Sequence, residues 1–264
     1  MKILRVVAIA AIVCGLCSAG PVTFDLNSSL GFWDNILLDG THTGGTFSVG
    51  PPQQGLNGVG TNVVRWGDTS AGDSDNPSRL QSGYEYNAVA PPTVPGIPVD
   101  TLFKVGTFVH ENQAITPGTS VLGATLNITM MMDFSGTPVN KTFAYHFAHN
   151  ETDNAGVGGI CPFGGGPVGE CPDFVTILNS VPDTNFVVGG QLYTLELIGF
   201  SKDGGLTKTS SFESAERSNN PADLFAIITA PPPSTLPEPG TLFLFAPPLA
   251  AFVVRRLWLR RTAR

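Results

Sequence analysis

The sequence has few charged residues and, away from its two ends, very few basic ones. Only 13% of its 264 residues are Asp, Glu, Lys or Arg. Residues 20–237 hold seven of the 14 basic residues but 20 of the 21 acidic ones, which gives this region a net charge of about −13. A chain of this kind lacks the basic surface that binding to phosphates requires, so we expect no nucleic-acid partner.

Short motifs of the common enzyme classes are also missing. The sequence has no Gly-x-Ser-x-Gly, no His-Glu-x-x-His and no glycine-rich phosphate-binding motif. Glycoside hydrolysis needs two carboxylates whose separation is defined in space, and nothing in the sequence singles out one pair. We therefore predict a protein that is not an enzyme and has no catalytic residue, with a secreted hydrolase as the least favoured alternative.

Long amphipathic helical patterns are absent as well, whereas short runs alternate between apolar and polar residues. In the clearest run, 124–134, every even position is apolar and most odd positions are polar, as in a half-buried strand. A second strand over 141–149 puts Phe143, Tyr145 and Phe147 on the core face, with 136–140 as the connecting loop. Other expected strands are 22–26, 45–49, 62–66, 102–110, 174–178, 191–200, 208–212 and 224–228.

These strands predict an all-β fold, an antiparallel β-sandwich of the jelly-roll or Ig-like kind, over residues 20–229. The proline-rich segment 88–98 is expected to be a loop and a seam between two β halves.

The two ends of the chain have the composition of targeting segments. Residues 1–19 combine a basic start, an apolar stretch and small residues before Ala19, which is typical of a secretory signal peptide. We therefore expect export through the Sec translocon and cleavage by signal peptidase. Residues 230–236 form a proline-rich spacer.

The last segment, 237–264, has three parts: a Pro-Glu-Pro-Gly motif, an apolar stretch and an arginine cluster. The apolar residues 241–254 would make a helix of about 21 Å, short for a bilayer core of about 30 Å. Prolines 247 and 248 would also interrupt that helix. A transient membrane-spanning sorting signal is therefore favoured over a permanent anchor helix, with the arginines on the cytoplasmic side. The residues that carry this prediction are Pro237, Glu238, Pro239, Gly240, Arg255, Arg256, Arg260 and Arg261.

This tail closely resembles the PEP-CTERM signal of exported proteins of Gram-negative bacteria. The resemblance implies recognition by an exosortase-like membrane protease, passage through the inner membrane, and a final place at the cell surface, in the outer envelope or in the extracellular matrix. It further implies a structural or adhesive role associated with exopolysaccharide and biofilm. A carbohydrate-binding module is the alternative, suggested by the sandwich and by four aromatic residues able to stack on sugars if exposed: Trp33, Trp66, Tyr84 and Tyr86. In a sandwich such residues are more often core or cross-strand partners.

Several internal blocks resemble the THxN family of PEP-CTERM proteins. The name motif of that family matches 106–112 only in part, since Val109 stands where the family has threonine. The resemblance implies a secreted, β-rich protein and supplies no catalytic site. Its best-matched residues are Arg65, Trp66, Gly67, His110, Asn112, His149, Asn150 and Glu151, and a further block covers 212–216.

Polar residues within these blocks, together with one pair of cysteines, raise the question of bound metal. Cys161 and Cys171 are expected to form a disulfide after export, with a metal pair or a redox-active dithiol as the alternative. Around His110 and His149, polar triplets are expected to hydrogen-bond loop backbone and fix turns, with zinc binding as the alternative. His146 and His149 would point to opposite faces of a strand and would not chelate together.

An oxygen-rich loop follows the second expected strand. Asp68, Asp73 and Asp75 are hard oxygen ligands of the kind that Ca²⁺ prefers. The spacing does not fit an EF-hand loop, so a solvated acidic loop is favoured over a calcium site.

Overall fold

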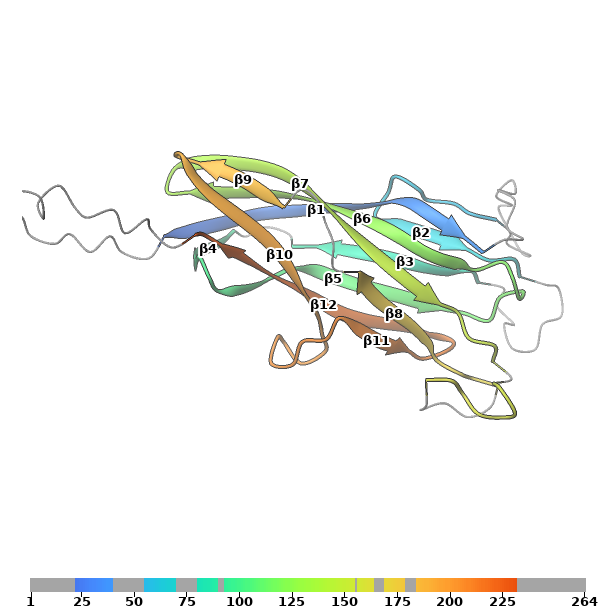
Figure 1. Cartoon of the computed structure of the whole chain (residues 1–264). Coiled ribbons are helices and arrows are strands. Elements are labelled where there is room, and N and C mark those ends of the chain that lie inside the picture. Colours follow the sequence, from blue (N-terminus) through green and yellow to red (C-terminus); the bar gives the residue numbers. More distant parts are fainter. Residues whose placement is uncertain are drawn as a thin grey trace, which may run out of the picture. The chain divides into compact units, whose positions relative to one another are not determined.

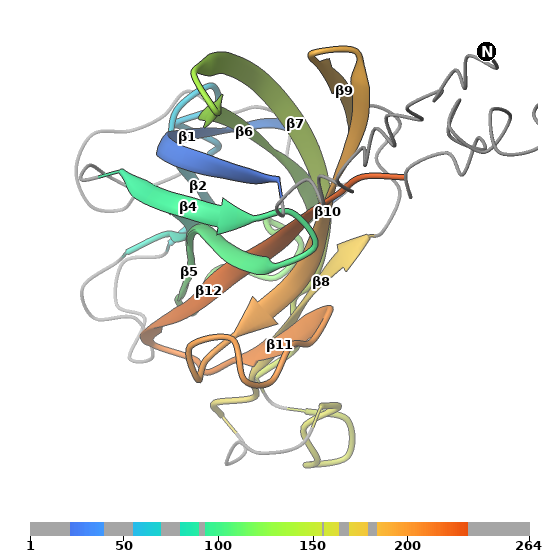
Figure 2. The ribbon, with the colours of Figure 1, turned by 90° about the vertical axis from the view of Figure 1, so that its left-hand side faces the viewer.

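The computed structural model of the chain describes residues 22–39, 55–69, 80–89, 93–154, 156–163, 169–178 and 184–231. In this part of the chain the structure is all-β and has no helix, as predicted. Two six-stranded antiparallel sheets face each other, and both are strongly curled (Figures 1 and 2). No helix among the described residues is long and apolar enough to cross a membrane.

The first sheet has the strand order β11-β8-β7-β6-β1-β4. Its strands, in chain order, are β1 (Thr23–Leu38), β4 (Val94–Pro98), β6 (Val121–Phe134), β7 (Thr137–Asn150), β8 (Asp173–Leu178) and β11 (Ser211–Ser214). The second sheet has the order β2-β3-β5-β12-β10-β9. Its strands are β2 (Val63–Trp66), β3 (Ser82–Ala88), β5 (Leu102–Asn112), β9 (Asn185–Val188), β10 (Gln191–Ser201) and β12 (Ser218–Thr229).

Side-chain alternation explains how the two sheets enclose one core. Along β6 all the even positions from Ala124 to Phe134 are buried, which confirms the period-two prediction. Phe143, Tyr145 and Phe147 of β7 are buried as predicted. The core contains residues from both sheets, including the fully buried Trp33 of β1.

The structure corrects several strand boundaries. The segment 88–98 is not one loop, because β4 pairs with β1 at Thr23↔Pro98 and Phe24↔Ile97. It carries the chain from β3 in the second sheet to β4 in the first. The expected loop 136–140 is also wrong: the turn is Ser135–Gly136, and β7 begins at Thr137.

Other strands were predicted too short, were shifted or were not predicted. β1 continues to Leu38 through irregularities in its pairing with β6, and such bulges break the alternation that sequence patterns rely on. β11 begins at Ser211 rather than 208, and β3 and β9 were not predicted. The expected strand 45–49, the signal peptide 1–19 and the sorting segment 237–264 lie outside the described residues.

Candidate functional site

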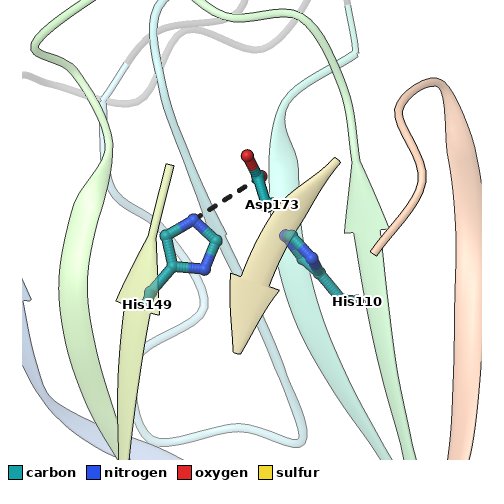
Figure 3. Close-up of side chains that lie close together, drawn as sticks. All are labelled: His110, His149 and Asp173. Atoms are coloured by element: carbon teal, nitrogen blue, oxygen red, sulfur yellow. Dashed lines mark ion pairs between the residues drawn. The ribbon is translucent and has the colours of Figure 1, made fainter. Parts of the chain in front are cut away.

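At one end of the sandwich, polar side chains from both sheets meet inside the core. His110 comes from β5 of the second sheet, and His149 and Asp173 come from β7 and β8 of the first. All three residues are buried, and each offers a donor atom within 4.8 Å of the donors of the other two. Figure 3 shows the two imidazole rings on either side of the Asp173 carboxylate.

Strand alternation puts these residues in the core. On β7 the inward row runs Phe143, Tyr145, Phe147 and then His149. On β5, Phe108 is followed two residues later by His110 and then by Asn112, all buried. The polar cluster is therefore the continuation, at one end, of the same inward-facing rows that build the apolar core.

A shell of hydrogen bonds orients His149 and Asp173. The Tyr84 hydroxyl lies 2.7 Å from His149 Nδ1. The backbone N–H and the hydroxyl of Thr152 both donate to Asp173 Oδ1, at 2.9 and 3.3 Å. These contacts leave His149 Nε2 facing Glu151 Oε2 at 3.3 Å and Asp173 Oδ2 at 3.7 Å. Glu151 Oε2 also accepts a hydrogen bond from the Ser120 hydroxyl at 2.8 Å.

His110 has no such partners. Neither of its ring nitrogens has a hydrogen-bond partner in the protein, although the residue is fully buried. Its ring stacks on Trp66 at a centroid distance of 6.0 Å and meets the His149 ring edge-on at 5.0 Å. Asp173 Oδ2 likewise lacks a hydrogen bond. Buried polar atoms are nearly always paired, so this cluster requires an explanation.

Three carboxyl groups form a second group, which shares Asp173 with the first. Glu151, Asp173 and Glu216 each place a carboxylate oxygen within 4.8 Å of the other two. Burial raises the pKa of Glu151 to about 7, although the Ser120 hydrogen bond opposes the shift. Burial and the nearby Glu151 raise the pKa of Glu216 to about 7, although the polar side chains of Asn154 and Asn112 oppose the shift. Burial also raises the pKa of Asp173, and the charge of Glu151 adds to that effect.

The neighbouring groups are held in their uncharged forms. Burial lowers the pKa of His110, and electrostatic interactions with His149 and Arg65 lower it further. Burial lowers the pKa of His149 too, while Asp173 acts in the opposite direction. Burial raises the pKa of Tyr84, as do the charges of Asp173 and Glu151. Neutral imidazole is the form of histidine that binds metal ions.

The Arg65-Trp66-Gly67 block lies beside the cluster. Arg65 pairs with Glu111 of β5 at 2.5 Å, which links β2 to the strand that carries His110. Trp66 covers both imidazoles, meeting the His149 ring edge-on at a centroid distance of 5.4 Å. Gly67 has a φ of 94°, and a Cβ there would lie 2.6 Å from Ile115 Cγ2. Glycine is therefore required where the chain leaves β2.

The connection from β7 to β8 carries cluster residues at both ends, Glu151 at its start and Asp173 just after its end. Cys161 and Cys171 form the predicted disulfide within it. The Thr152 hydroxyl donates to the Cys171 carbonyl at 2.9 Å. This bond joins the start of the connection to its end. Cys171 of the disulfide and Asp173 of the cluster therefore lie on the same short segment, which Thr152 holds in place.

Two surface clefts approach the cluster. One, of about 410 Å³, is lined by residues that include Ser120, His149 and Glu151. The other, of about 660 Å³, includes Glu216 and Asn220 in its lining. The Glu151 side chain keeps 23% of its surface exposed, so it lies between solvent and the buried histidines.

The predicted site residues have different outcomes. His110, Asn112, His149 and Glu151 belong to the cluster, whereas Asn150 is exposed at the end of β7.

The expectation that these histidines fix turns through loop backbone is wrong. His110 has no hydrogen bond through its ring, and His149 bonds to side chains. The amide of Asn112 does bond backbone, donating to the Ser214 carbonyl at 2.9 Å. His146 bonds to Thr125 and lies outside the cluster, as alternation predicted.

The predicted calcium ligands were expected in one loop. Asp68 Oδ1 accepts a hydrogen bond from the Gly55 N–H at 2.9 Å. Asp73 and Asp75 lie outside the described residues.

The four aromatic residues considered as sugar-stacking groups are all buried, with at most 1% of their surface exposed: Trp33, Trp66, Tyr84 and Tyr86. They pack in the core instead, and Tyr84 contributes to the polar cluster.

Asp173 is the ligand-type residue that the sequence prediction missed. The expected strand began at Phe174, one residue too late. With Val175 and Ile177 as the apolar row of this strand, period two puts Asp173 on the buried face. An acidic residue in line with a core row was therefore the signal.

No model of a known protein family matches the chain, and a search of the curated proteins also found no match. What the site can do chemically therefore follows from its geometry. It offers two groups of ligand atoms that share Asp173, one with His110 and His149 and the other with Glu151 and Glu216, and such donors are suited to holding a cation.

Proposed function

We propose that this protein is an exported structural or adhesive component of the cell surface or extracellular matrix of a Gram-negative bacterium. Residues 1–19 direct it to the Sec translocon and are removed by signal peptidase. The PEP-CTERM-like segment 237–264, with its membrane helix and arginine cluster, passes it through the inner membrane to an exosortase-like protease. The β-domain then associates with extracellular polysaccharide.

The observation that carries this proposal is the disulfide between Cys161 and Cys171. Structural disulfides persist in oxidising compartments outside the cytoplasm and are rare within it. This one closes a segment, 161–171, whose sequence is rich in glycine and proline. An exported protein exposed to solvent and proteases gains order in such a loop from a covalent link.

The aromatic residues that suggested a carbohydrate-binding module are not at the surface. Sugar stacking needs an exposed aromatic face, and the four aromatic residues considered for that role are in the core. We therefore assign association with polysaccharide to the surface of the acidic domain as a whole rather than to a stacking platform.

Fractionation of cells that encode an exosortase tests the proposal. The full chain is expressed with its own ends, and each fraction is analysed by intact mass under non-reducing conditions. We expect envelope or extracellular protein that lacks residues 1–19 and has been cleaved near the Pro-Glu-Pro motif. Replacing Pro237 and Glu238 by alanine should leave the C-terminal segment in place. As the control, replacing Pro232 and Ser234 of the spacer by alanine should still allow the C-terminal segment to be removed.

A chain that stays in the cytoplasm at full length, with two free thiols, would refute export. The matrix role is tested separately by co-sedimentation of the purified protein with the polysaccharide of the producing organism. The measurement is made at physiological salt, where weak charge-driven association is screened. Absence of the protein from the pellet would refute the matrix role alone.

A further inference from the structure

We infer that His110, His149 and Asp173 bind one divalent transition-metal ion of the zinc type, which joins the two sheets inside the core. Glu151 and Glu216 each have a carboxylate oxygen within 4.8 Å of one on Asp173 and are the candidates for a further ligand. This inference goes beyond the proposed function and does not depend on it, because it rests only on the geometry of the described residues.

The atoms that lack partners are the first evidence. The hydrogen bonds around the cluster use His149 Nδ1 and Asp173 Oδ1. Asp173 Oδ2 has no hydrogen bond and lies 3.7 Å from His149 Nε2, which also contacts Glu151 Oε2 at 3.3 Å. His110 offers two ring nitrogens, and the protein pairs neither. Metal-binding histidines characteristically use their second nitrogen for an outer hydrogen bond, as His149 does with Tyr84.

The spacing is the second line of evidence. Zinc lies about 2.0–2.2 Å from nitrogen and oxygen ligands, so tetrahedral ligands are roughly 3.3–3.5 Å from one another. The donors of the cluster already lie within 4.8 Å of one another. Side-chain shifts of less than about 1 Å would bring them to coordinating distance. To bind the metal through Nε2, the neutral imidazole of His149 carries its proton on Nδ1, from which it is donated to the Tyr84 hydroxyl.

The donor types select the metal. Calcium and magnesium take oxygen ligands almost exclusively, so a pair of imidazoles disfavours both. Two histidines with a carboxylate suit zinc and its neighbours among the divalent transition metals. Three carboxyl groups near one point add negative charge that a dication offsets. The cleft lined by Ser120, His149 and Glu151 gives the ion a route from solvent.

A purely hydrogen-bonded cluster is the competing explanation. It would leave a buried imidazole with an unpaired N–H in either tautomer, a cost of about 1–3 kcal/mol. A bound cation gives a partner to the lone-pair nitrogen of His110 and to Asp173 Oδ2, two buried acceptors that the hydrogen-bonded cluster leaves unpaired.

The test uses the full chain, purified with its disulfide formed and without a polyhistidine tag. The chain is stripped with a chelator and then titrated with Zn²⁺ in competition with a zinc indicator. We expect one Zn²⁺ per chain and a higher melting temperature when zinc is bound. The His110→Phe and Asp173→Asn variants should bind zinc at least about 100-fold more weakly, since loss of a ligand exceeds the effect of an outer-shell change.

The His146→Phe variant is the matched control, because it makes the same substitution on β7 outside the cluster, and it should bind like the wild type. Tyr84→Phe removes a positioning residue and should weaken binding roughly tenfold without abolishing it. His110→Phe keeps an aromatic ring against Trp66, which favours retention of the fold. Circular dichroism checks this directly.

A wild-type chain that binds no stoichiometric zinc would overturn the inference. Equal affinity in His110→Phe, or displacement of zinc by an equal concentration of Ca²⁺, would overturn it as well. Co²⁺ gives a readout that needs no variant. The wild-type chain should develop the visible absorption of four-coordinate cobalt, and a spectrum identical to aqueous Co²⁺ would contradict the site.

Discussion

Removing the disulfide is the perturbation whose cost the structure allows us to work out most directly. Cys161 and Cys171 are ten positions apart. In the chain-entropy model, opening a loop of this length in the unfolded chain costs about 2.8 kcal/mol of folding stability at 25 °C. For a domain of this size, that corresponds to a fall in melting temperature of about 6–11 °C.

The burial of the two cysteines adds a second contribution to the loss of stability when serine replaces them. Cys171 is fully buried and Cys161 is 6% exposed, so a serine hydroxyl at either position would enter an apolar setting. Each hydroxyl left without a partner adds about 1–3 kcal/mol. The double alanine variant therefore isolates the loss of the cross-link better than the double serine variant, and the serine pair should be the less stable of the two.

Urea denaturation followed by tryptophan fluorescence measures these differences, because the buried Trp33 and Trp66 report on the core. The expected result is a lower midpoint for the alanine pair than for the oxidised wild type. Wild-type protein reduced and then alkylated is the additional comparison. A change below about 0.5 kcal/mol would refute the reasoning, since it would mean that the 161–171 loop contributes no order to the native state.

Two further substitutions test the packing that supports the site. Trp33→Ala should destabilise the protein by about 3–5 kcal/mol, because it leaves a large cavity among Tyr84, Phe108 and Phe147. The control, Phe32→Ala on the exposed face of β1, should cost about 0.5 kcal/mol or less. Equal midpoints in urea for the two variants would contradict the assigned register of β1. Gly67→Ala should cost at least about 1 kcal/mol more than Gly136→Ala. Both glycines have a positive φ, but only at Gly67 would a Cβ meet a packed side chain. Thermal melts of the two variants check this difference, and a smaller loss for Gly67→Ala would show that Ile115 moves freely.

The fold class and the longest strands were predictable because their inward rows are regular. β6 and the second half of β7 alternate without interruption, so the core residues could be assigned from period two alone. β1 was predicted at less than half its length because its pairing with β6 shifts at Leu26/Ser28 and again after Asp34. Edge strands such as β4, with its exposed Pro95 and Gly96, carry too little pattern to be distinguished from loops.

The candidate site was predicted in pieces but not as a whole. The sequence indicated that His110, Asn112, His149 and Glu151 were unusual, yet it gave no distances between blocks some 40 residues apart. β5 in one sheet faces β7 in the other across the core, where Phe108 and Phe147 stack, and no local pattern encodes this long-range arrangement. The sequence prediction treated the ends of both strands as turns. In the structure β5 continues to Asn112 and β7 to Asn150, and the side chains of His110 and His149 are buried.

The placement of the cluster connects export, the disulfide and the metal site through one segment. Thr152 donates to the Cys171 carbonyl and to Asp173, so the covalent loop and the metal ligand depend on the same backbone. Any stabilisation that the disulfide gives to this segment must favour metal binding, and by thermodynamic linkage bound metal must favour the disulfide to the same extent. The reduced chain in the cytoplasm would then bind the ion more weakly than the oxidised chain outside. The cluster would acquire its ion where the proposed function places the protein, after export rather than before.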